Sequence, residues 1–264
     1  MIRVLVAGAA GRMGREVVGA VSAADGMEVV AIVDPGAVGV TVDSGTEGAA
    51  LVCRAGLAEA IDECHPDVMV DFTHPTVVEA NLRIALAGGV DCVVGTTGLS
   101  EEKLLELSHL ASGDTALFFA PNFAIGAVLM MDFAVRAARF MPHVEIIELH
   151  HDQKADAPSG TALRTAQLVA AARSSAPQTP GRDTELPGLD GARGAVVDGV
   201  HVHSIRLPGL VAHQEVLFGG QGQTLSIRHD TIDRTSFMPG VVLAVREIKA
   251  RRGLVIGLDQ LMGE

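Results

Sequence analysis

The stretch "IRVLVAGAAGRMG", residues 2–14, joins a short apolar run to a glycine-rich turn and then to a helical pattern. Gly8, Gly11 and Gly14 stand in the spacing GxxGxxG. A helix that starts at such a turn directs its free N–H groups and the positive end of its dipole toward an anion. The missing Cβ atoms let the backbone approach a pyrophosphate. The stretch therefore predicts the phosphate-binding turn of a Rossmann-type dinucleotide-binding domain.

The second apolar run supports this prediction, since "MEVVAIVD" (27–34) ends in Asp34, twenty residues beyond Gly14. An acid at this position commonly binds the ribose hydroxyls of adenosine. Its charge disfavours a 2′-phosphate and favours NAD, whereas Arg12 and Arg15 supply charge that suits NADP. The sequence therefore predicts NADH and/or NADPH as the cofactor. The alternative is a tight turn between strand and helix with a solvated Asp34.

Apolar runs and helical patterns continue to alternate up to about residue 120. The later runs are "DVMVDFT" (67–73), "DCVVGTTG" (91–98) and "TALFFAP" (115–121), and the helical patterns are 14–24, 75–89 and 100–111, the last with Ser100 as N-cap. Val-rich strands separated by helices predict a parallel sheet covered on both faces. Thr73, Thr96 and Thr97 follow strands at the carboxyl edge, where ligands bind. We expect them to flank the nicotinamide and its ribose, the alternative being turn and capping roles.

The pattern changes after residue 121. A helix (124–140), a strand (144–151) and a second helix (159–174) precede a Pro/Gly-rich surface loop (176–194), three alternating segments (200–208, 211–219 and 223–230), and a tail of helix (239–253) and strand (254–261). Alternation with short connections predicts an antiparallel or mixed sheet exposed on one face. The chain thus predicts an α/β protein of two domains, a dinucleotide-binding domain (1–124 plus 235–264) and a mixed-sheet domain (125–234) that binds substrate.

Composition narrows the class of protein. The 264 residues are 48% hydrophobic and 20% charged, as in globular proteins, and the formal net charge of -12 argues against nucleic acid and acidic membranes as partners. Three cysteines form no CxxC pair and no complete disulfide framework, which fits a reducing cytosol. No apolar run reaches about twenty residues, and the N-terminal run is too short for a signal peptide. We expect a soluble cytoplasmic protein.

The stretch "ELHHDQKADAPSGTAL", residues 148–163, concentrates titratable and hydroxyl side chains. His150 and His151 end a strand, and histidine donates or accepts protons near neutral pH. Lys154 adds a positive charge to the loop that follows. The next helix begins at Ser159, Gly160 and Thr161. Its hydroxyls and free N–H groups suit a carboxylate. The stretch therefore predicts a site for a small dianionic substrate that is protonated as it is reduced.

Plainer interpretations exist for each of these residues. His150 is then a buried core histidine, Lys154 a solvated loop charge and Ser159 a simple N-cap. A zinc site would draw on His150, His151, Asp152, His201 and His203. No cysteine or HExxH spacing supports zinc, so no metal site is expected.

The motifs together resemble the 4-hydroxy-tetrahydrodipicolinate (dihydrodipicolinate) reductase family. The resemblance rests on "GAAGRMG", "DFTHP", "VVGTTG", "APNFAIGAV" and above all "ELHHDQKADAPSGTA", and it spans nearly the whole chain. It implies a Rossmann-type domain, a mixed α/β substrate and oligomerisation domain, and a homotetramer built through the latter. It also implies reduction by NADH or NADPH in the diaminopimelate route to lysine, with a small dicarboxylate as substrate.

The resemblance also implies roles for single residues. His150 is the proton donor and Lys154 its catalytic partner, while His151, Ser159, Gly160 and Thr161 bind the substrate carboxylates. The cofactor-binding positions are Gly8, Gly11, Arg12, Met13, Gly14, Asp34, Phe72, Thr73, Gly95, Thr96, Thr97, Ala120, Pro121, Asn122 and Phe123. Some members carry two basic residues in the first loop, whereas this chain has Ala10 and Arg12, which leaves the cofactor preference open.

The sequence leaves two rival functions open. One is another Rossmann dehydrogenase of amino-acid metabolism, which would not require the DAPSGT sequence beside paired histidines. The other is a non-catalytic cofactor sensor, which predicts a damaged 148–163 stretch, whereas this one is intact.

Overall fold

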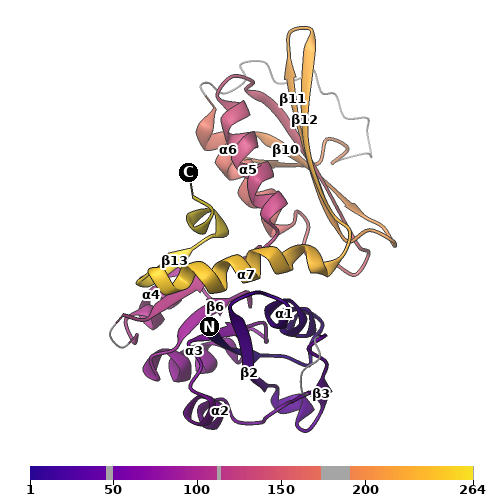
Figure 1. Ribbon diagram of the computed structural model, residues 1–264. Coiled ribbons are helices and arrows are strands. Elements are labelled where there is room, and N and C mark those ends of the chain that lie inside the picture. The colour runs from indigo at the N-terminus through magenta and orange to yellow at the C-terminus, as the bar shows by residue number, and fades with distance from the viewer. Residues whose placement is uncertain (46–49, 112–113, 174–190, 264) are drawn as a thin grey trace. The chain divides into compact units, whose positions relative to one another are not determined.

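The computed structural model describes residues 1–45, 50–111, 114–173 and 191–263. It divides into two units, Met1–Ile125 with Arg234–Glu264, and Gly126–Asp233 (Figure 1). These boundaries lie one residue from those expected at 124/125 and 234/235. The second unit is thus inserted between two parts of the first.

The first unit is built on a six-stranded parallel sheet of order β13-β7-β6-β5-β1-β2. Its strands are β1 (Ile2–Ala7), β2 (Met27–Val33), β5 (Val68–Asp71), β6 (Asp91–Val94), β7 (Ala116–Phe119) and β13 (Gly253–Ile256). The chain order reverses at β1, with β2 on one side and β5 on the other. Open parallel sheets bind ligands at the carboxyl edge beside such a switch point.

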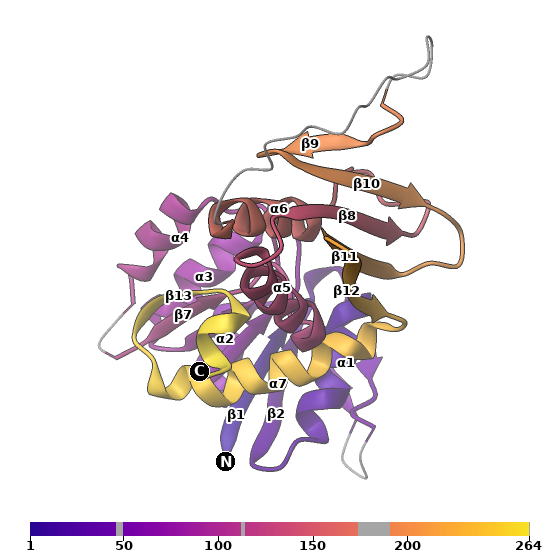
Figure 2. The ribbon, with the colours of Figure 1, turned by 90° about the horizontal axis from the view of Figure 1, so that it is seen from above.

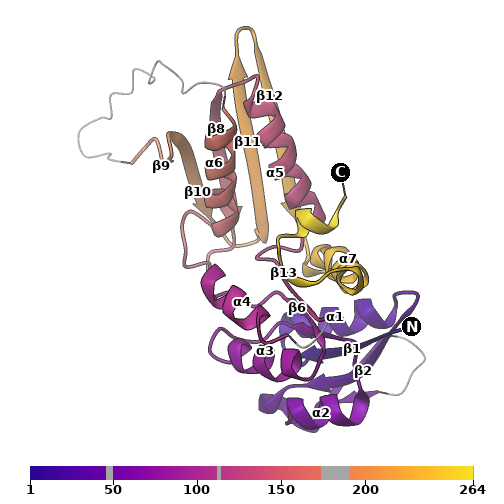
Figure 3. The same cartoon turned by 90° about the vertical axis from the view of Figure 1, so that its left-hand side faces the viewer.

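Helices cover both faces of this sheet. They are α1 (Arg12–Ser22), α2 (Leu57–Cys64), α3 (Val78–Ala87), α4 (Glu101–Ser108) and α7 (Met238–Glu247). α1 packs with α7, and α3 packs with both α2 and α4 on the opposite side (Figure 3). Because both faces are covered, consecutive side chains along β1 are buried, from Val4 to Ala7. The predicted α/β class with a parallel sheet is confirmed.

Short elements and element ends differ from the sequence prediction. The sequence patterns did not predict several short elements. These are the helix α2, the two-residue strands β3 (Thr41–Val42) and β4 (Leu51–Val52), and the 3-10 helices Pro35–Ala37, Arg234–Phe237, Ile248–Ala250 and Leu258–Leu261. The N-cap of α2 is Gly56, which has no side chain to cap the helix, so the sequence lacks the usual Ser, Thr, Asp or Asn start signal. The Ser100 cap of α4 is confirmed, because its hydroxyl accepts a hydrogen bond from Lys103 N at 3.2 Å.

The second unit is a mixed five-stranded sheet of order β12-β11-β8-β10-β9. Its elements are α5 (Ile125–Ala138), β8 (His143–His150), α6 (Gly160–Ala172), β9 (Ala195–Val197), β10 (Val200–Arg206), β11 (Ala212–Gly220) and β12 (Gln223–Thr231). β10 runs parallel to β8 and the other pairs are antiparallel, so the mixed alternative is the correct one. The surface loop expected at 176–194 falls largely outside the described residues.

The two helices of the second unit lie side by side against one face of its sheet (Figures 1 and 2). Apolar side chains fill the interface, among them Met130 of α5, Ile146 of β8, Ala166 of α6 and Phe218 of β11. The alternating partners on β8, Glu145 and Ile147, face away from the helices and are half-buried. Side chains of β8 at even-numbered positions therefore point toward the helices, and Glu148 and His150 share that direction.

Candidate active site

The reason for glycine differs among the three positions of the first turn. Gly8 has φ +79°, and a Cβ there would lie 2.5 Å from the backbone oxygen of Phe72. A Cβ on Gly14 would lie 2.1 Å from the backbone oxygen of Gly8. Gly11 differs, because a Cβ there would meet only the Gly8 oxygen, at 3.2 Å. Gly8 and Gly14 are therefore required by the turn itself. At Gly11 the missing side chain instead leaves the backbone accessible to an approaching ligand.

The start of α1 fits a phosphate. Its N-cap is Gly11, which has no side chain to cap the helix, and the first turn of α1 contains no acidic residue. The first N–H groups of a helix lack partners within it and attract anions. Arg12 is exposed here, and Met13 is half-buried. The backbone and charge of this turn therefore suit a dinucleotide pyrophosphate.

Asp34 is tied to this turn. Its Oδ2 accepts a hydrogen bond from Ala10 N at 3.1 Å, and its Oδ1 accepts one from Gly36 N at 3.1 Å. A carboxylate has about four acceptor positions, so two remain for ribose hydroxyls. Arg15 Nε donates to the backbone oxygen of Ala10 at 3.0 Å, which holds that guanidinium against the turn. Asp34 is therefore half-buried and held against the turn by two backbone N–H groups.

A buried carboxylate organises the next two loops. Asp71, at the end of β5, is fully buried, and its Oδ1 accepts from the hydroxyls of Thr73 and Thr96, both at 2.7 Å. Thr73 N donates to the Thr96 hydroxyl at 2.7 Å, and Asn81 Nδ2 donates to Asp71 Oδ2 at 2.8 Å. The two threonines are thus brought together as expected, but their hydroxyls bind Asp71. Thr97 is exposed at the same edge.

Aromatic packing joins the remaining predicted cofactor positions. A Cβ on Gly95 would lie 2.1 Å from the ring of Phe72, so only glycine leaves room for that ring. The Phe72 and Phe123 ring centroids are 5.5 Å apart. Ala120 N donates to Val94 O at 3.1 Å, and Asn122 Oδ1 accepts from Ala124 N at 2.9 Å. Pro121 between them is exposed. The loops after β1, β5, β6 and β7 therefore meet at one edge of the sheet.

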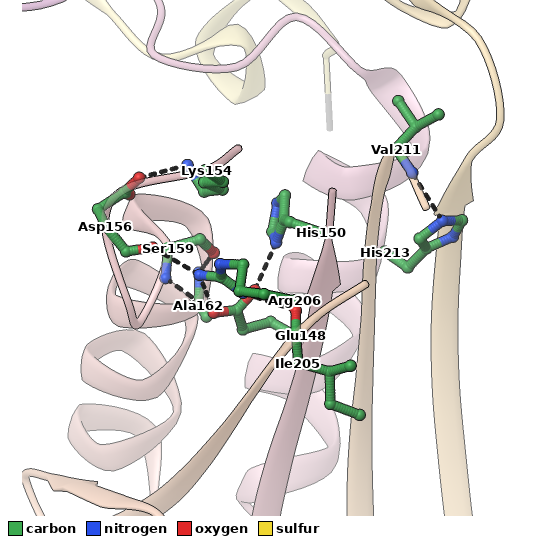
Figure 4. A network of polar contacts seen from close by, with 10 residues as sticks. All are labelled: Glu148, His150, Lys154, Asp156, Ser159, Ala162, Ile205, Arg206, Val211 and His213. Atoms are coloured by element: carbon green, nitrogen blue, oxygen red, sulfur yellow. Dashed lines mark hydrogen bonds and ion pairs between the residues drawn. The ribbon is translucent and has the colours of Figure 1, made fainter. Parts of the chain in front are cut away.

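In the second unit, the stretch 148–163 is organised around one buried carboxylate, that of Glu148 (Figure 4). Its side chain is 0% exposed, and that of His150 is 13% exposed. His150 Nδ1 is hydrogen-bonded to Glu148 Oε2. Arg206, at the end of β10, donates from Nη1 to Oε2 at 2.9 Å and from Nη2 to Oε1 at 2.8 Å. Ser159 N donates to Oε1 at 3.2 Å, so three elements meet at one side chain.

This environment keeps Glu148 ionised. Burial raises its pKa, but hydrogen bonds from His150, Arg206 and Ser204 outweigh burial and hold the pKa at about 2. Arg206 Nη2 also donates to the backbone oxygen of Asp156 at 2.5 Å, which fixes the loop that carries Lys154. The network therefore positions both predicted catalytic residues from one buried centre.

The other predicted residues of this stretch differ in burial, since Lys154 is half-buried, Ser159 is buried and Gly160 is exposed. Lys154 Nζ is 2.7 Å from Asp156 Oδ1, and this ion pair lowers the pKa of Asp156. His151 is exposed. The Ser159 hydroxyl caps α6 by accepting from Ala162 N at 3.2 Å, as its plain interpretation required. A side chain added at Gly160 would meet nothing within 4 Å, so the start of α6 is open beside Thr161.

Comparison with known proteins decides the family. Two protein-family models match the chain. The model described as dihydrodipicolinate reductase, N-terminus, matches residues 2–123, and the model described as dihydrodipicolinate reductase, C-terminus, matches residues 126–262. The chain belongs to the dihydrodipicolinate reductase family. A 4-hydroxy-tetrahydrodipicolinate reductase from Nocardia farcinica is 54% identical over 263 residues, 99% of this chain and 98% of the relative. Another from Mycobacterium sp. (strain KMS) is 51% identical over 263 residues, 99% of each chain.

A solved structure agrees with this assignment. The dipicolinate-bound dihydrodipicolinate reductase from Paenisporosarcina sp. TG-14 is 44% identical and superposes with a TM-score of 0.84, covering 99% of this chain and 100% of that one. The resemblance predicted from the motifs is confirmed. Dihydrodipicolinate reductases are NAD(P)H-dependent oxidoreductases, which confirms the cofactor and enzyme class and rejects both rival functions.

Some residues that shape this reductase site were not assigned a role from the sequence. Glu148, Arg206, Asp71 and Asp156 each hold or orient a predicted site residue. A signal existed for Glu148, because a carboxylate inside the apolar strand "VEIIELHH" shares a strand face with His150. Arg206 gave none, since its pairing with Glu148 spans 58 residues of sequence.

In this reductase, His201 and His203 lie on a different face of the sheet from His150. His203 Nε2 is 2.8 Å from Glu145 Oε2, and His201 Nδ1 is 2.8 Å from Arg193 O. Both rings lie on the face of the sheet opposite Glu148, as the register of β10 with β8 requires. Within the described ranges, no group of three or more His, Cys, Asp or Glu side chains is arranged to hold a metal ion.

Proposed function

We propose that this protein reduces 4-hydroxy-tetrahydrodipicolinate to tetrahydrodipicolinate in the diaminopimelate route to lysine. The network that joins Glu148, His150 and Arg206 beside the start of α6 carries this proposal. One short stretch thus provides a histidine oriented by a hydrogen bond, a lysine and a helix N-terminus, which suits reduction and protonation of a dicarboxylate.

The reaction sets what the residues must do. The 4-hydroxyl leaves as water, and the ring gains one hydride and one proton, so the product differs from the substrate by one oxygen atom. When bound in the first unit, NADH or NADPH supplies the hydride. The protein must therefore hold two carboxylates, exclude water and deliver a proton to the reduced ring.

His150 is the proton donor in this proposal. Its Nδ1 is occupied by Glu148, so Nε2 is the nitrogen left to face a ligand. The side chain is only 13% exposed, which limits exchange of the proton with bulk water. A positioned acid of this kind accelerates a reaction about 10²–10⁴-fold.

Lys154 acts on charge. Its ammonium group is paired with Asp156 at 2.7 Å, and that carboxylate is 57% exposed. An exposed pair of this kind contributes little to stability, so exchange of Asp156 for a substrate carboxylate costs little. Lys154 then attracts the dicarboxylate and stabilises negative charge that develops on the ring during reduction.

The substrate carboxylates are assigned to the start of α6 and to His151. Ser159, Gly160 and Thr161 open that helix, whose N–H groups and dipole favour an anion. The open space at Gly160 and the exposure of His151 support this assignment. Ser159 contributes mainly as the cap, since its hydroxyl is engaged with Ala162 N.

The cofactor is assigned to the carboxyl edge of the first sheet. The turn at Gly8, Gly11 and Gly14 with Arg12 and Met13 binds the pyrophosphate, and Asp34 binds the adenosine ribose. The loops carrying Phe72, Thr73, Gly95, Thr96, Thr97, Ala120, Pro121, Asn122 and Phe123 bind the nicotinamide half. Because the Thr73 and Thr96 hydroxyls bind Asp71, their part is to shape the edge rather than to contact the ligand.

A homotetramer built through the second unit is also proposed. The face of its sheet away from the helices carries half-buried apolar side chains at Ile147, Leu149 and Leu217, with Ile205 41% exposed. Apolar area on an open sheet face is typical of an interface between copies. A cytoplasmic location fits the free cysteines Cys53, Cys64 and Cys92. In the described parts of the chain, no helix is long and apolar enough to cross a membrane.

A coupled assay tests the activity directly. The substrate is generated enzymatically in the cuvette, and oxidation of NADH or NADPH is followed by absorbance with and without this protein. We expect oxidation that depends on both substrate and protein, and that is lost in His150→Gln. Absence of substrate-dependent oxidation with either cofactor, by correctly folded protein, would reject the proposal.

A further inference from the structure

We propose that Glu148 is a positioning residue, whose buried carboxylate holds the His150 ring with its proton on Nδ1 and thereby makes Nε2 the nitrogen that exchanges a proton with the substrate. This inference rests on the proposed role of His150. It adds a residue that acts through another, because the Glu148 side chain is fully buried.

Several hydrogen-bond donors surround the Glu148 carboxylate. Arg206 donates twice, the backbone N–H of Ser159 donates once, and the side chain of Ser204 also hydrogen-bonds the carboxylate. A guanidinium group and a backbone amide are donors only, and in their presence Glu148 stays ionised, so its oxygens accept and never donate. The contact between Glu148 Oε2 and His150 Nδ1 is therefore one in which the carboxylate accepts. Nδ1 must therefore carry the hydrogen.

Burial makes this arrangement stringent. The Glu148 side chain is 0% exposed and that of Arg206 is 19% exposed, so no bulk water substitutes for a lost contact. The low pKa of Glu148, about 2, agrees with a carboxylate that stays charged at any pH where the enzyme works. A neutral His150 has one hydrogen, and with that hydrogen on Nδ1 the Nε2 lone pair is free to accept a proton. Protonated His150 then carries the transferable proton on Nε2.

The same strand offers a matched control. Glu145 contacts a histidine and an arginine as Glu148 does, through His203 at 2.8 Å and through Arg193. It lies on the other face of the sheet, and its side chain is 35% exposed. A carboxylate that contacts His and Arg without serving His150 should leave the chemistry unchanged.

The kinetic test compares Glu148→Gln with Glu145→Gln. Glutamine keeps the size of the side chain, but its amide both donates and accepts, so it binds either form of the His150 ring. We expect kcat of Glu148→Gln to fall at least about 10-fold, with KM values for substrate and cofactor changed less than about threefold. Glu145→Gln should keep kcat within about twofold, at unchanged molecular mass in solution.

The spectroscopic test reads the ring itself. Nitrogen-15 spectra of histidine-labelled protein distinguish the Nδ1–H form from the Nε2–H form, and the His150 signals are those missing from His150→Gln. We expect neutral His150 to be in the Nδ1–H form in the unaltered protein and to become a mixture in Glu148→Gln. This measurement needs no turnover, and its first half needs only the unaltered protein.

The outcomes separate this inference from the proposed function. If His150→Gln is impaired while Glu148→Gln turns over normally, the histidine is catalytic and Glu148 does not position it. If His150 is in the Nε2–H form in the unaltered protein, the inference is wrong whatever the kinetics. If His150→Gln itself turns over normally, the proposed function of His150 fails, and the ring spectra still decide what Glu148 holds.

Discussion

The carboxylate of Asp34 and the backbone N–H of Ala10 are joined by a hydrogen bond of 3.1 Å. This bond ties the end of the second strand to the turn that follows the first. The position of the carboxylate is thus set by the protein and does not depend on a ligand to orient it.

Replacement of Asp34 by Ala should therefore change the cofactor ratio. We expect NADH binding to weaken by about 1–2 kcal/mol, since a pair of charge-assisted hydrogen bonds to the ribose is lost, and NADPH binding to weaken less. Titration of reduced-cofactor fluorescence measures both, because the chain has no Trp or Tyr. Asp62→Ala on the exposed side of α2 serves as the control. An unchanged NADH/NADPH ratio would show that Asp34 does not bind the ribose.

Substitutions at two glycines of the first turn should affect stability and cofactor binding differently. Gly14→Ala places a Cβ 2.1 Å from a backbone oxygen and should destabilise the protein by about 2–3 kcal/mol. Gly11→Ala meets only one atom, at 3.2 Å, so it should keep the thermal midpoint and weaken cofactor binding. Thermal unfolding and cofactor titration of both variants check this. Equal loss of stability in the two variants would contradict the assignment.

Pyridine-2,6-dicarboxylate, a flat mimic of the substrate, should inhibit competitively by binding the second unit. Its two carboxylates suit the start of α6 and the positive charge of Lys154. Thr161→Val should weaken this inhibitor while cofactor affinity stays nearly constant, as calorimetric titration of each ligand will show. A comparable loss of both affinities would mean that Thr161 supports the fold rather than the ligand.

His150 and Lys154 should differ in their kinetic effects. His150→Gln should lower kcat strongly with a modest change in KM, because the proton acts only in the transition state. Lys154→Ala should impair KM and kcat together, since its charge acts on both the bound substrate and the developing negative charge. The double variant should be far less impaired than the product of the single effects. Steady-state kinetics of the four proteins test this, and strict multiplicativity would show that the residues act independently.

Acid should unfold the protein partly through Glu148. Its pKa is lowered from 4.5 to about 2, so the stability that it contributes is full above pH 4.5 and is lost as the pH falls through 2. This difference corresponds to about 3 kcal/mol. Urea unfolding at fixed protein concentration, between about pH 5 and pH 2, should therefore show a shallower pH dependence for Glu148→Gln. Parallel pH dependence in the two proteins would contradict a low pKa for Glu148.

Local sequence patterns predicted most of the elements, and long-range pairing explains what they missed. The alternation of Val-rich runs with helices predicted the parallel sheet of the first unit, because both periodicities are local. That β10 runs parallel to β8 was not predicted, since strand pairing depends on segments far apart in sequence. The predicted strand at 91–98 ends at Val94, because Gly95 packs against Phe72 and begins the loop.

The same limit applies to the site. The residues proposed to face a ligand, such as His150, Lys154 and Gly11, stand in recognisable motifs whose chemistry can be argued from side-chain type and spacing. The residues that hold them, Glu148 and Asp71, are carboxylates within or at the end of apolar strands. Their burial becomes understandable only when distant partners such as Arg206 are known.

The insertion of the second unit has a consequence for synthesis on the ribosome. The strand β7 pairs with β13, and α1 packs with α7, but β13 and α7 both lie after residue 233. In a nascent chain that has emerged as far as α5, β7 pairs with β6 on one side and its other edge is open, which favours association with other chains. The unit that binds the dinucleotide is the first to begin folding and the last to be completed.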